Sequence, residues 1–161
     1  MAARPYSKLE ERIGNRVVQW MSRLNVWAYR WSGGRLGGKF LQGAPVLLLI
    51  SKGRKSGEPR TAPLLYLQEG ERYYLVASKG GMSHHPAWYL NLEAEPDCEI
   101  EIGRQRLSMR ARRLSAEEKA AVWPRLVAIY RYYDAYQQRT ARDIPVLELR
   151  PRPAAGAGTN G

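Results

Sequence analysis

The sequence has few of the residues that build disulfide frameworks or conventional zinc sites. One cysteine and two histidines occur among 161 residues, and neither kind of site can be assembled from so few ligands. No apolar run approaches the roughly 18 residues that a membrane-spanning helix needs, and the first 30 residues lack the apolar stretch of a secretory signal. We therefore expect a cytoplasmic protein, soluble or held peripherally at the inner face of the cell membrane.

Acidic residues are scarce relative to basic ones. The chain has 26 Lys and Arg against 15 Asp and Glu, a formal net charge of +11. Such an excess predicts a polyanionic partner, which can be a nucleic acid, an acidic membrane surface or an anionic small molecule. Because no recognised nucleic-acid-binding motif accompanies the charge, we do not expect a nucleic-acid partner.

The N-terminal part of the chain, residues 1–43, is predicted to be an amphipathic helix followed by a glycine-rich connector. Residues 32–39 of the connector read as a flexible linker. The helical face can pack on the protein's own core, or it can contact an anionic membrane or a partner, since arginines flank it and tryptophan favours membrane interfaces. Over residues 7–31 the apolar side chains that share this face recur at steps of three or four: Leu9, Ile13, Val17, Trp20, Leu24, Trp27 and Trp31.

Residues 44–150 are predicted to form one domain of short strands, and residues 151–161 a disordered tail. Helices are expected from Pro86 to Glu95 and from Ser115 toward Tyr130. Since strands and helices do not alternate regularly, the fold class is α+β, an antiparallel barrel of about six strands rather than a doubly wound sheet. The strands are expected at residues 45–50, 61–68, 72–78, 98–102, 107–111 and 144–149.

A cationic loop between two predicted strands carries the clearest chemical signal. Residues 53–60 read Gly-Arg-Lys-Ser-Gly-Glu-Pro-Arg, with three cations and a hydroxyl. Glycines let backbone amides turn toward an anion, and arginine grips phosphate or carboxylate with two parallel hydrogen bonds. The loop is therefore either an anion site or a solvated basic turn.

Other segments can face the same ligand. A strand end runs into a glycine turn over residues 76–81, and a helix beginning near Pro86 directs free amides at whatever precedes it. His84 and His85 are adjacent and are expected to be solvated loop residues rather than metal ligands. The tyrosines at steps of three after residue 129 can wall a pocket for a flat ring or deliver a proton. No catalytic triad or metal-ligand cluster is evident, so an enzyme built on this chain needs a bound cofactor.

Residues 53–60, 77–81 and 86–92 resemble the deazaflavin-dependent nitroreductase family, and the similarity extends from Trp20 to Pro145. The resemblance implies a split β-barrel like that of flavin-binding pyridoxamine-phosphate oxidases. It also implies a bound 8-hydroxy-5-deazaflavin, coenzyme F-420, whose reduced form passes a hydride to a quinone-like or nitroaromatic acceptor. Two alternatives stay open: an FMN-dependent oxidoreductase of the same fold, and a carrier that binds the deazaflavin without turnover.

The same resemblance implies roles for single residues. The phosphate and polyglutamate tail of the cofactor would be held by Arg54, Lys55, Ser56 and Arg60. The rest of the cofactor would be bordered by Thr61, Ala62, Pro63, Leu64 and Leu65, by Val76, Ala77, Ser78 and Lys79, and by Ala87, Trp88, Tyr89, Leu90 and Asn91. Tyr133 would close over the ring, and the candidate catalytic residues that shape the acceptor side would be Ser78, Tyr130, Tyr133 and Tyr136.

One position departs from the family pattern. Leu65 stands where the best-known member has a tyrosine after its Pro-Leu pair. Tyr66 cannot substitute for that tyrosine, because neighbouring residues of a strand face opposite sides. The resemblance therefore favours quinone reduction over activity on bicyclic nitroimidazoles.

Overall fold

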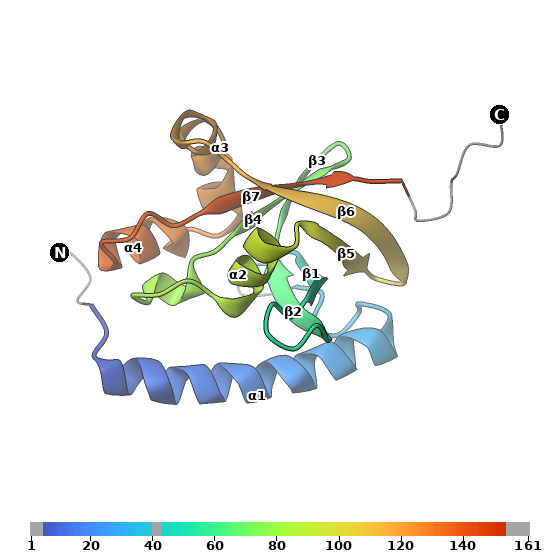
Figure 1. Cartoon of the computed structure of the whole chain (residues 1–161), viewed down its shortest axis with the longest axis horizontal. Coiled ribbons are helices and arrows are strands. Elements are labelled where there is room, and N and C mark those ends of the chain that lie inside the picture. Colours follow the sequence, from blue (N-terminus) through green and yellow to red (C-terminus); the bar gives the residue numbers. More distant parts are fainter. Residues whose placement is uncertain (1–4, 40–42, 154–161) are drawn as a thin grey trace.

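A single curled antiparallel sheet forms the body of the protein (Figure 1). The computed structural model describes residues 5–39 and 43–153, and of residues 15–21 only the backbone. Within this part the strand order is β2-β1-β5-β6-β7-β4-β3. The strands are β1 (Val46–Lys52), β2 (Pro59–Leu65), β3 (Leu67–Glu69), β4 (Arg72–Val76), β5 (Asp97–Ile102), β6 (Gln105–Arg113) and β7 (Val146–Pro151). The α+β class is confirmed.

The sheet has seven strands in the described residues, where about six were expected. The difference arises at Tyr66, which interrupts the predicted strand 61–68 and separates β2 from β3. Leu65 and Tyr66 pack against different apolar clusters, as expected for neighbouring residues of an extended chain.

Alternation along the strands builds two apolar cores, one on each side of the sheet. In β4, Tyr73 and Leu75 face a core inside the curl of the sheet, together with Leu49, Ile100 and Met109. The next residues of β4 face the other way, toward the helices at the C-terminal end of the chain. That second core contains Tyr74, Val76, Leu114, Val122, Leu126, Tyr130, Tyr133, Ile144 and Val146.

The helices surround the sheet on several sides. They are α1 (Lys8–Ser32), α2 (Ala87–Ala94), α3 (Ala116–Ile129) and α4 (Tyr132–Arg139), with a 3-10 turn, η2 (Lys79–Gly81). A capping box at Ser115 and Glu118 begins α3, and another at Ser7 and Glu10 begins α1. In each box the serine hydroxyl and the glutamate carboxylate satisfy two amides at the helix start. Figure 1 shows α1 along one side of the molecule and α3 on the other.

The apolar face of α1 is exposed in the side chains described, so of the two alternatives left open by the sequence, packing of this face on the core is wrong for these side chains. Leu24 is 56% exposed, Trp27 63% and Trp31 70%, and Leu9 and Ile13 are exposed as well. The opposite face meets the body because it carries a small residue, Gly14, and side chains that hydrogen-bond there. Periodicity identified an apolar face but not what covers it.

Polar contacts hold α1 at both ends. Near its start, the Glu11 carboxylate accepts hydrogen bonds from the Ser83 amide (2.8 Å) and hydroxyl (3.0 Å). Near its end, the Tyr29 hydroxyl accepts a hydrogen bond from the Gly103 amide (2.7 Å), and Arg30 makes a two-bond ion pair with Glu101. The helix therefore spans the body with its middle over β2.

The connector is a packed turn in its described part and not the flexible linker that was expected. Gly33 ends α1 in the left-handed conformation, and the Leu36 amide bonds to the Ser32 hydroxyl at 2.8 Å. Gly34 lies so close to the β5–β6 turn that a Cβ there would be 2.9 Å from the Gly103 Cα. Of the predicted disordered tail, Pro151 ends β7 and the Arg152 amide donates to the Ser108 carbonyl at 3.1 Å, so the expectation is wrong for these two residues; residues 154–161 lie outside the described part of the chain.

None of the helices described is both long enough and apolar enough to cross a bilayer.

Candidate functional site

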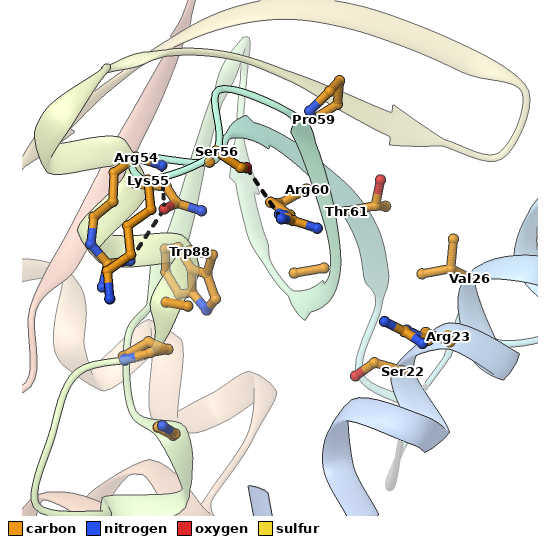
Figure 2. Close-up of a pocket in the computed structure, with 16 residues that line it drawn as sticks. Ser22, Arg23, Val26, Arg54, Lys55, Ser56, Pro59, Arg60, Thr61 and Trp88 are labelled. Atoms are coloured by element: carbon orange, nitrogen blue, oxygen red, sulfur yellow. Dashed lines mark hydrogen bonds between the residues drawn. The ribbon is translucent and has the colours of Figure 1, made fainter. Parts of the chain in front are cut away.

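A cavity of about 740 Å³ lies between α1, the β1–β2 loop and the start of α2. Figure 2 shows Ser22, Arg23 and Val26 of α1 on one side and the cationic loop on the other. Ten of the residues assigned to cofactor binding line this cavity: Arg54, Lys55, Ser56, Arg60, Thr61, Ala62, Lys79, Ala87, Trp88 and Asn91. These residues come from three separate segments, which the fold brings together.

The β1–β2 loop is a tight turn that depends on two glycines. The Gly53 amide bonds to the Glu58 carbonyl and the Gly57 amide to the Gly53 carbonyl, both at 2.8 Å. Gly57 has φ 72°, which favours glycine. A Cβ on Gly53 would lie 2.8 Å from the Ser56 hydroxyl and 3.1 Å from the Glu58 carbonyl oxygen. The glycines therefore let the loop fold back on itself beneath its cations.

Two side chains orient the arginines of this loop. The Ser56 hydroxyl accepts a hydrogen bond from Arg60 Nη2 at 3.2 Å, drawn dashed in Figure 2. Asn91 of α2 is buried, and its Oδ1 accepts from the Arg54 amide (3.1 Å) and from Arg54 Nη1 (3.4 Å). Both guanidinium groups are therefore held by neutral partners that leave their charge uncompensated.

The cavity is lined by cations without acidic partners. Arg23, Arg54, Lys55, Arg60 and Lys79 line it, and no Asp or Glu of the described residues does. Within the described part of the chain, no carboxylate lies within 4.0 Å of any of these five charges, although many other basic residues form ion pairs, as Arg112 does with Glu118 at 2.8 Å. Burial is the main reason that the pKa of Lys79 is lowered, and the more distant Glu11 carboxylate opposes this shift only in part. The lining of the cavity therefore carries a net positive charge, which suits an anionic ligand.

The strand end after β4 forms the floor of the cavity on one side. Lys79, Gly80 and Gly81 all have left-handed backbones, with φ of 44°, 62° and 77°. Lys79 Nζ lies 2.7 Å from His84 Nε2.

His84 is exposed, as expected. His85 is half-buried and packs on the Tyr89 ring at 4.8 Å, so the expectation that it is solvated is wrong; the packing comes from α2, which follows it directly.

Tyr130, at the end of α3, and Tyr133 and Tyr136 of α4 lie behind this floor and do not line the cavity. Tyr133 is 5% exposed and belongs to the second core, with Leu65 packed against the same cluster. The hydroxyls of Tyr130 and Tyr136 lie 3.0 Å apart. Burial raises the pKa of Tyr133 and of Tyr136, so both phenols stay protonated at neutral pH. The backbone of Tyr136 presses on Gly81, which connects this cluster to the cavity floor.

The other residues assigned to the site support the cavity from behind rather than lining it. Ala77 and Tyr89 are fully buried in the first core, against which Leu64 and Leu90 pack. Val76 lies in the second core, Ser78 is buried beside η2, and Pro63 lies in β2. The sole cysteine, Cys98, is buried in the first core, and burial raises the pKa of its thiol to about 12, so it offers no reactive thiolate.

Some lining residues were not identified from the sequence. Ser22, Arg23 and Val26 come from α1, and Gly53, Pro59 and Pro86 from the loop and helix start. One signal was available for α1: Ser22, Val26 and Tyr29 follow each other at steps of four and three, away from the apolar face. Such a second stripe indicates the face that docks on the body.

Comparison with known proteins gives consistent results. A family model described as F420H(2)-dependent quinone reductase matches residues 20–151. Rv1261c, an F420H(2)-dependent quinone reductase of Mycobacterium tuberculosis, is 38% identical over 149 residues, 89% of this chain and 96% of that protein. A second protein of the same organism, Rv3178, is 45% identical over 118 residues, 73% of this chain and 99% of its own.

Solved structures agree in fold. An F420-H2 dependent reductase (FDR-A) is 39% identical with a TM-score of 0.61, over 66% of this chain and 94% of its own. A structure described as a domain-swapped dimer is 32% identical with a TM-score of 0.64, over 82% of this chain and 98% of its own. The curled antiparallel sheet is therefore the split-barrel architecture of such reductases.

Proposed function

The chain belongs to the F420H(2)-dependent quinone reductase family, whose cofactor is coenzyme F-420, and from this premise we propose that the cavity under α1 binds that cofactor and directs its hydride to a quinone-like acceptor. One observation carries the proposal: five cations line the cavity, and in the described part of the chain none has a carboxylate within 4.0 Å. A phosphodiester with an acidic tail supplies the missing charge.

The residues present fit this group. Arg54, Lys55, Ser56 and Arg60 would hold the phosphate and tail, because their donors already converge on one loop and are oriented by Asn91 and by each other. Trp88 offers a flat aromatic surface within the same cavity, which suits a planar ring. When bound, the reduced cofactor supplies the hydride. The chain's own residues bind it, orient it and exclude water beneath α1.

The acceptor side is proposed to involve Ser78 and the tyrosines Tyr130, Tyr133 and Tyr136. Reduction of a quinone by a hydride also consumes a proton, and phenols held in the protonated form can supply or relay one. The tyrosines lie behind η2, so an acceptor in the cavity can contact them only if it extends beyond Lys79, which lines the cavity. A nitroaromatic is the second acceptor class; Leu65 packs on the tyrosine cluster and adds no hydroxyl there.

The binding proposal is tested by titrating the purified protein with coenzyme F-420 and following the fluorescence of the cofactor at low salt. In the variants Lys55→Gln and Arg60→Gln we expect Kd to rise about tenfold each, since a charge-assisted hydrogen bond contributes roughly 1.5–3 kcal/mol. Arg110→Gln is the matched control, because Arg110 of β6 pairs with Asp97 of β5 and does not line the cavity. Absence of binding by the unmodified protein would refute the proposal.

A steady-state assay and the absorbance spectrum distinguish a quinone reductase from the two alternatives of the same fold, a non-catalytic carrier and an FMN-dependent oxidoreductase. Steady-state oxidation of reduced F-420 with menadione as acceptor is expected for a quinone reductase. Tight binding without acceptor-dependent oxidation would instead indicate a carrier. A yellow protein with the absorbance of FMN as purified would favour a flavin-dependent oxidoreductase.

We also propose that residues 7–31 bring the enzyme to an anionic membrane surface, where apolar quinones dissolve. Two features support this: the described side chains of the apolar face of α1 are exposed, and Lys8, Arg12 and Arg23 are exposed on the same helix. Interfacial helices combine such a cationic surface with tryptophan and leucine on one face. Residues 1–43 carry eight basic and two acidic residues, so the attraction is concentrated at this end of the chain.

A further inference from the structure

Arg142 lies in the segment between α4 and β7, and its guanidinium group makes hydrogen bonds through all three nitrogens, none of them to a carboxylate. Its Nε donates to the Met82 carbonyl at 2.9 Å. Its Nη1 donates to the Ala77 carbonyl (3.2 Å) and to His85 Nδ1 (3.1 Å), and its Nη2 to the carbonyls of Ala77 (3.2 Å) and Ser78 (2.8 Å). A guanidinium has five N–H donors, and each of the five has an acceptor here.

The carbonyls that Arg142 binds flank the left-handed turn of η2. Ser78 precedes this turn and Met82 follows it, while Lys79 within it has φ 44°. A left-handed backbone costs a residue with a side chain roughly 1–2 kcal/mol, so a lysine stays in it only where the surroundings hold the chain. The guanidinium binds both ends of the turn and provides that restraint.

The same group reaches the start of α2 through His85. Since arginine only donates, Nδ1 of His85 must accept, which leaves the ring neutral with its proton on Nε2. Burial, together with the nearby Arg142 charge, lowers the pKa of His85 and agrees with this form. His85 directly precedes Pro86, the N-cap of α2, after which Ala87 and Trp88 line the cavity. Arg142 therefore joins the end of β4, η2 and α2.

We propose that Arg142 is a positioning residue for the proposed cofactor site: without lining the cavity itself, its guanidinium fixes the η2 turn and the start of α2, so that Lys79 projects toward the anionic cofactor. The inference rests on the proposed function for the identity of the ligand. Its geometric part, the restraint of η2, concerns the protein alone. A lysine at this position could not replace the group, because an ammonium has three donors and no planar fork.

The first experiment compares Arg142→Lys and Arg142→Met with Arg110→Lys as the control, by F-420 titration and thermal unfolding. Positioning predicts that Arg142→Lys, which keeps the charge, raises Kd about tenfold and nearly as much as Arg142→Met. If Arg142→Lys binds like the unmodified protein, only the charge matters and the proposal is overturned. If Arg142→Met does not fold, the Kd of Arg142→Lys alone tests the proposal.

A double-mutant cycle tests whether Arg142 acts through Lys79. Adding Lys79→Met to Arg142→Lys is expected to raise Kd much less than the product of the two single effects, because the positioned charge is already lost. For Lys55→Met, on the other side of the cavity, we expect independence: combined with Arg142→Lys, it should raise Kd by the product of the two single factors. Independent, multiplying effects of Arg142 and Lys79 would overturn the proposal.

Hydrogen exchange of the unliganded protein provides a readout that needs no cofactor. The amides of Gly81 and Met82 bond within the turn to the Ser78 and Lys79 carbonyls. In Arg142→Lys we expect them to exchange at least tenfold faster, with the Gly103 amide unchanged. Unchanged exchange of the turn would overturn the positioning role even if F-420 binds, whereas faster exchange without any F-420 binding would refute only the proposed function.

Discussion

Gly81 shows how a single residue connects the cavity floor to the helix behind it. Its backbone is left-handed, and a Cβ there would lie 2.7 Å from the Tyr136 carbonyl oxygen and 3.0 Å from its Cα. Gly80, its neighbour, is also left-handed, but a Cβ would meet nothing within 4 Å. Alanine substitutions at these two glycines therefore distinguish two destabilising effects. At Gly80 only the left-handed backbone is unfavourable, whereas at Gly81 the added Cβ also clashes with Tyr136.

We expect Gly81→Ala to lower the free energy of unfolding by about 2–4 kcal/mol, because two backbones must move apart. Gly80→Ala carries only the conformational cost, roughly 1–2 kcal/mol. Urea unfolding of both variants measures the difference. Equal losses would show that a methyl group on Gly81 meets no steric obstacle at Tyr136, contrary to this prediction.

Residue-level predictions from the sequence succeeded where the signal is local. The helix expected from Ser115 does begin there, and the loop at residues 53–60 lines a cavity; each of these predictions depends on a few neighbouring positions. Arg142 could not be found in this way, since its acceptors lie 57 to 65 residues away in the chain. Nothing near Arg142 in the sequence indicates a partner at Ala77.

Among the elements, α1 shows most clearly what periodicity can and cannot give. Its bounds were predicted to within a residue, because an apolar stripe runs from Leu9 to Trp31. The docking face was missed, because contacts through Glu11 and Tyr29 depend on loops at residues 83 and 103 that only the fold brings near.

The Glu11 contact makes the docking of α1 dependent on pH. The hydrogen bond from the Ser83 amide is the main reason that the pKa of Glu11 lies below its ordinary value of 4.5. A carboxylate with a lowered pKa contributes stability above that ordinary value and loses it as the pH falls through the folded value. We expect Glu11→Gln to reduce stability by about 1 kcal/mol at pH 7, with a difference that shrinks below pH 4.5.

Unfolding of the two proteins across a pH series measures this difference. Ser83→Ala, which keeps the amide and removes the hydroxyl, is expected to show a smaller loss. A constant gap between Glu11→Gln and the unmodified protein down to the acid limit would contradict the assignment.

At the scale of the whole molecule, exposed apolar side chains are segregated. Every large hydrophobic residue that is exposed in the described part of the chain lies between positions 6 and 36: Tyr6, Leu9, Ile13, Leu24, Trp27, Trp31 and Leu36. Isolated exposed residues of this kind are normal on soluble proteins, whereas a gathered set marks an interaction surface. In the described part of the sheet and of the other helices, the large apolar side chains are buried or half-buried against one another.

We expect the protein to sediment with vesicles that contain anionic lipid and much less with neutral ones. The double variant Trp27→Ser/Trp31→Ser should weaken this binding at least tenfold, since two exposed indoles are lost, and Arg12→Gln should weaken it by roughly 1 kcal/mol. Arg110→Gln, on β6, is the control and should bind normally. Equal binding of all variants would exclude α1 as the contact.

The overall architecture was largely predictable, and the arrangement of the site was not. Short alternating runs such as residues 98–102 indicate strands, and the absence of regular alternation between strands and helices excludes a parallel sheet. The order of strands, which puts β1 beside both β2 and β5, follows from long-range pairing that local patterns do not encode. The cavity lies where these pairings place α2 opposite α1.

Val26 and Trp27 are adjacent in α1, yet Val26 lines the cavity and Trp27 is 63% exposed on the outer surface. A helix with its side chains is about 10 Å across, so this single layer of protein separates the interior of the site from whatever the outer face touches. If the outer face rests on lipid as proposed, the cavity lies only about one helix diameter from the medium in which an apolar acceptor dissolves.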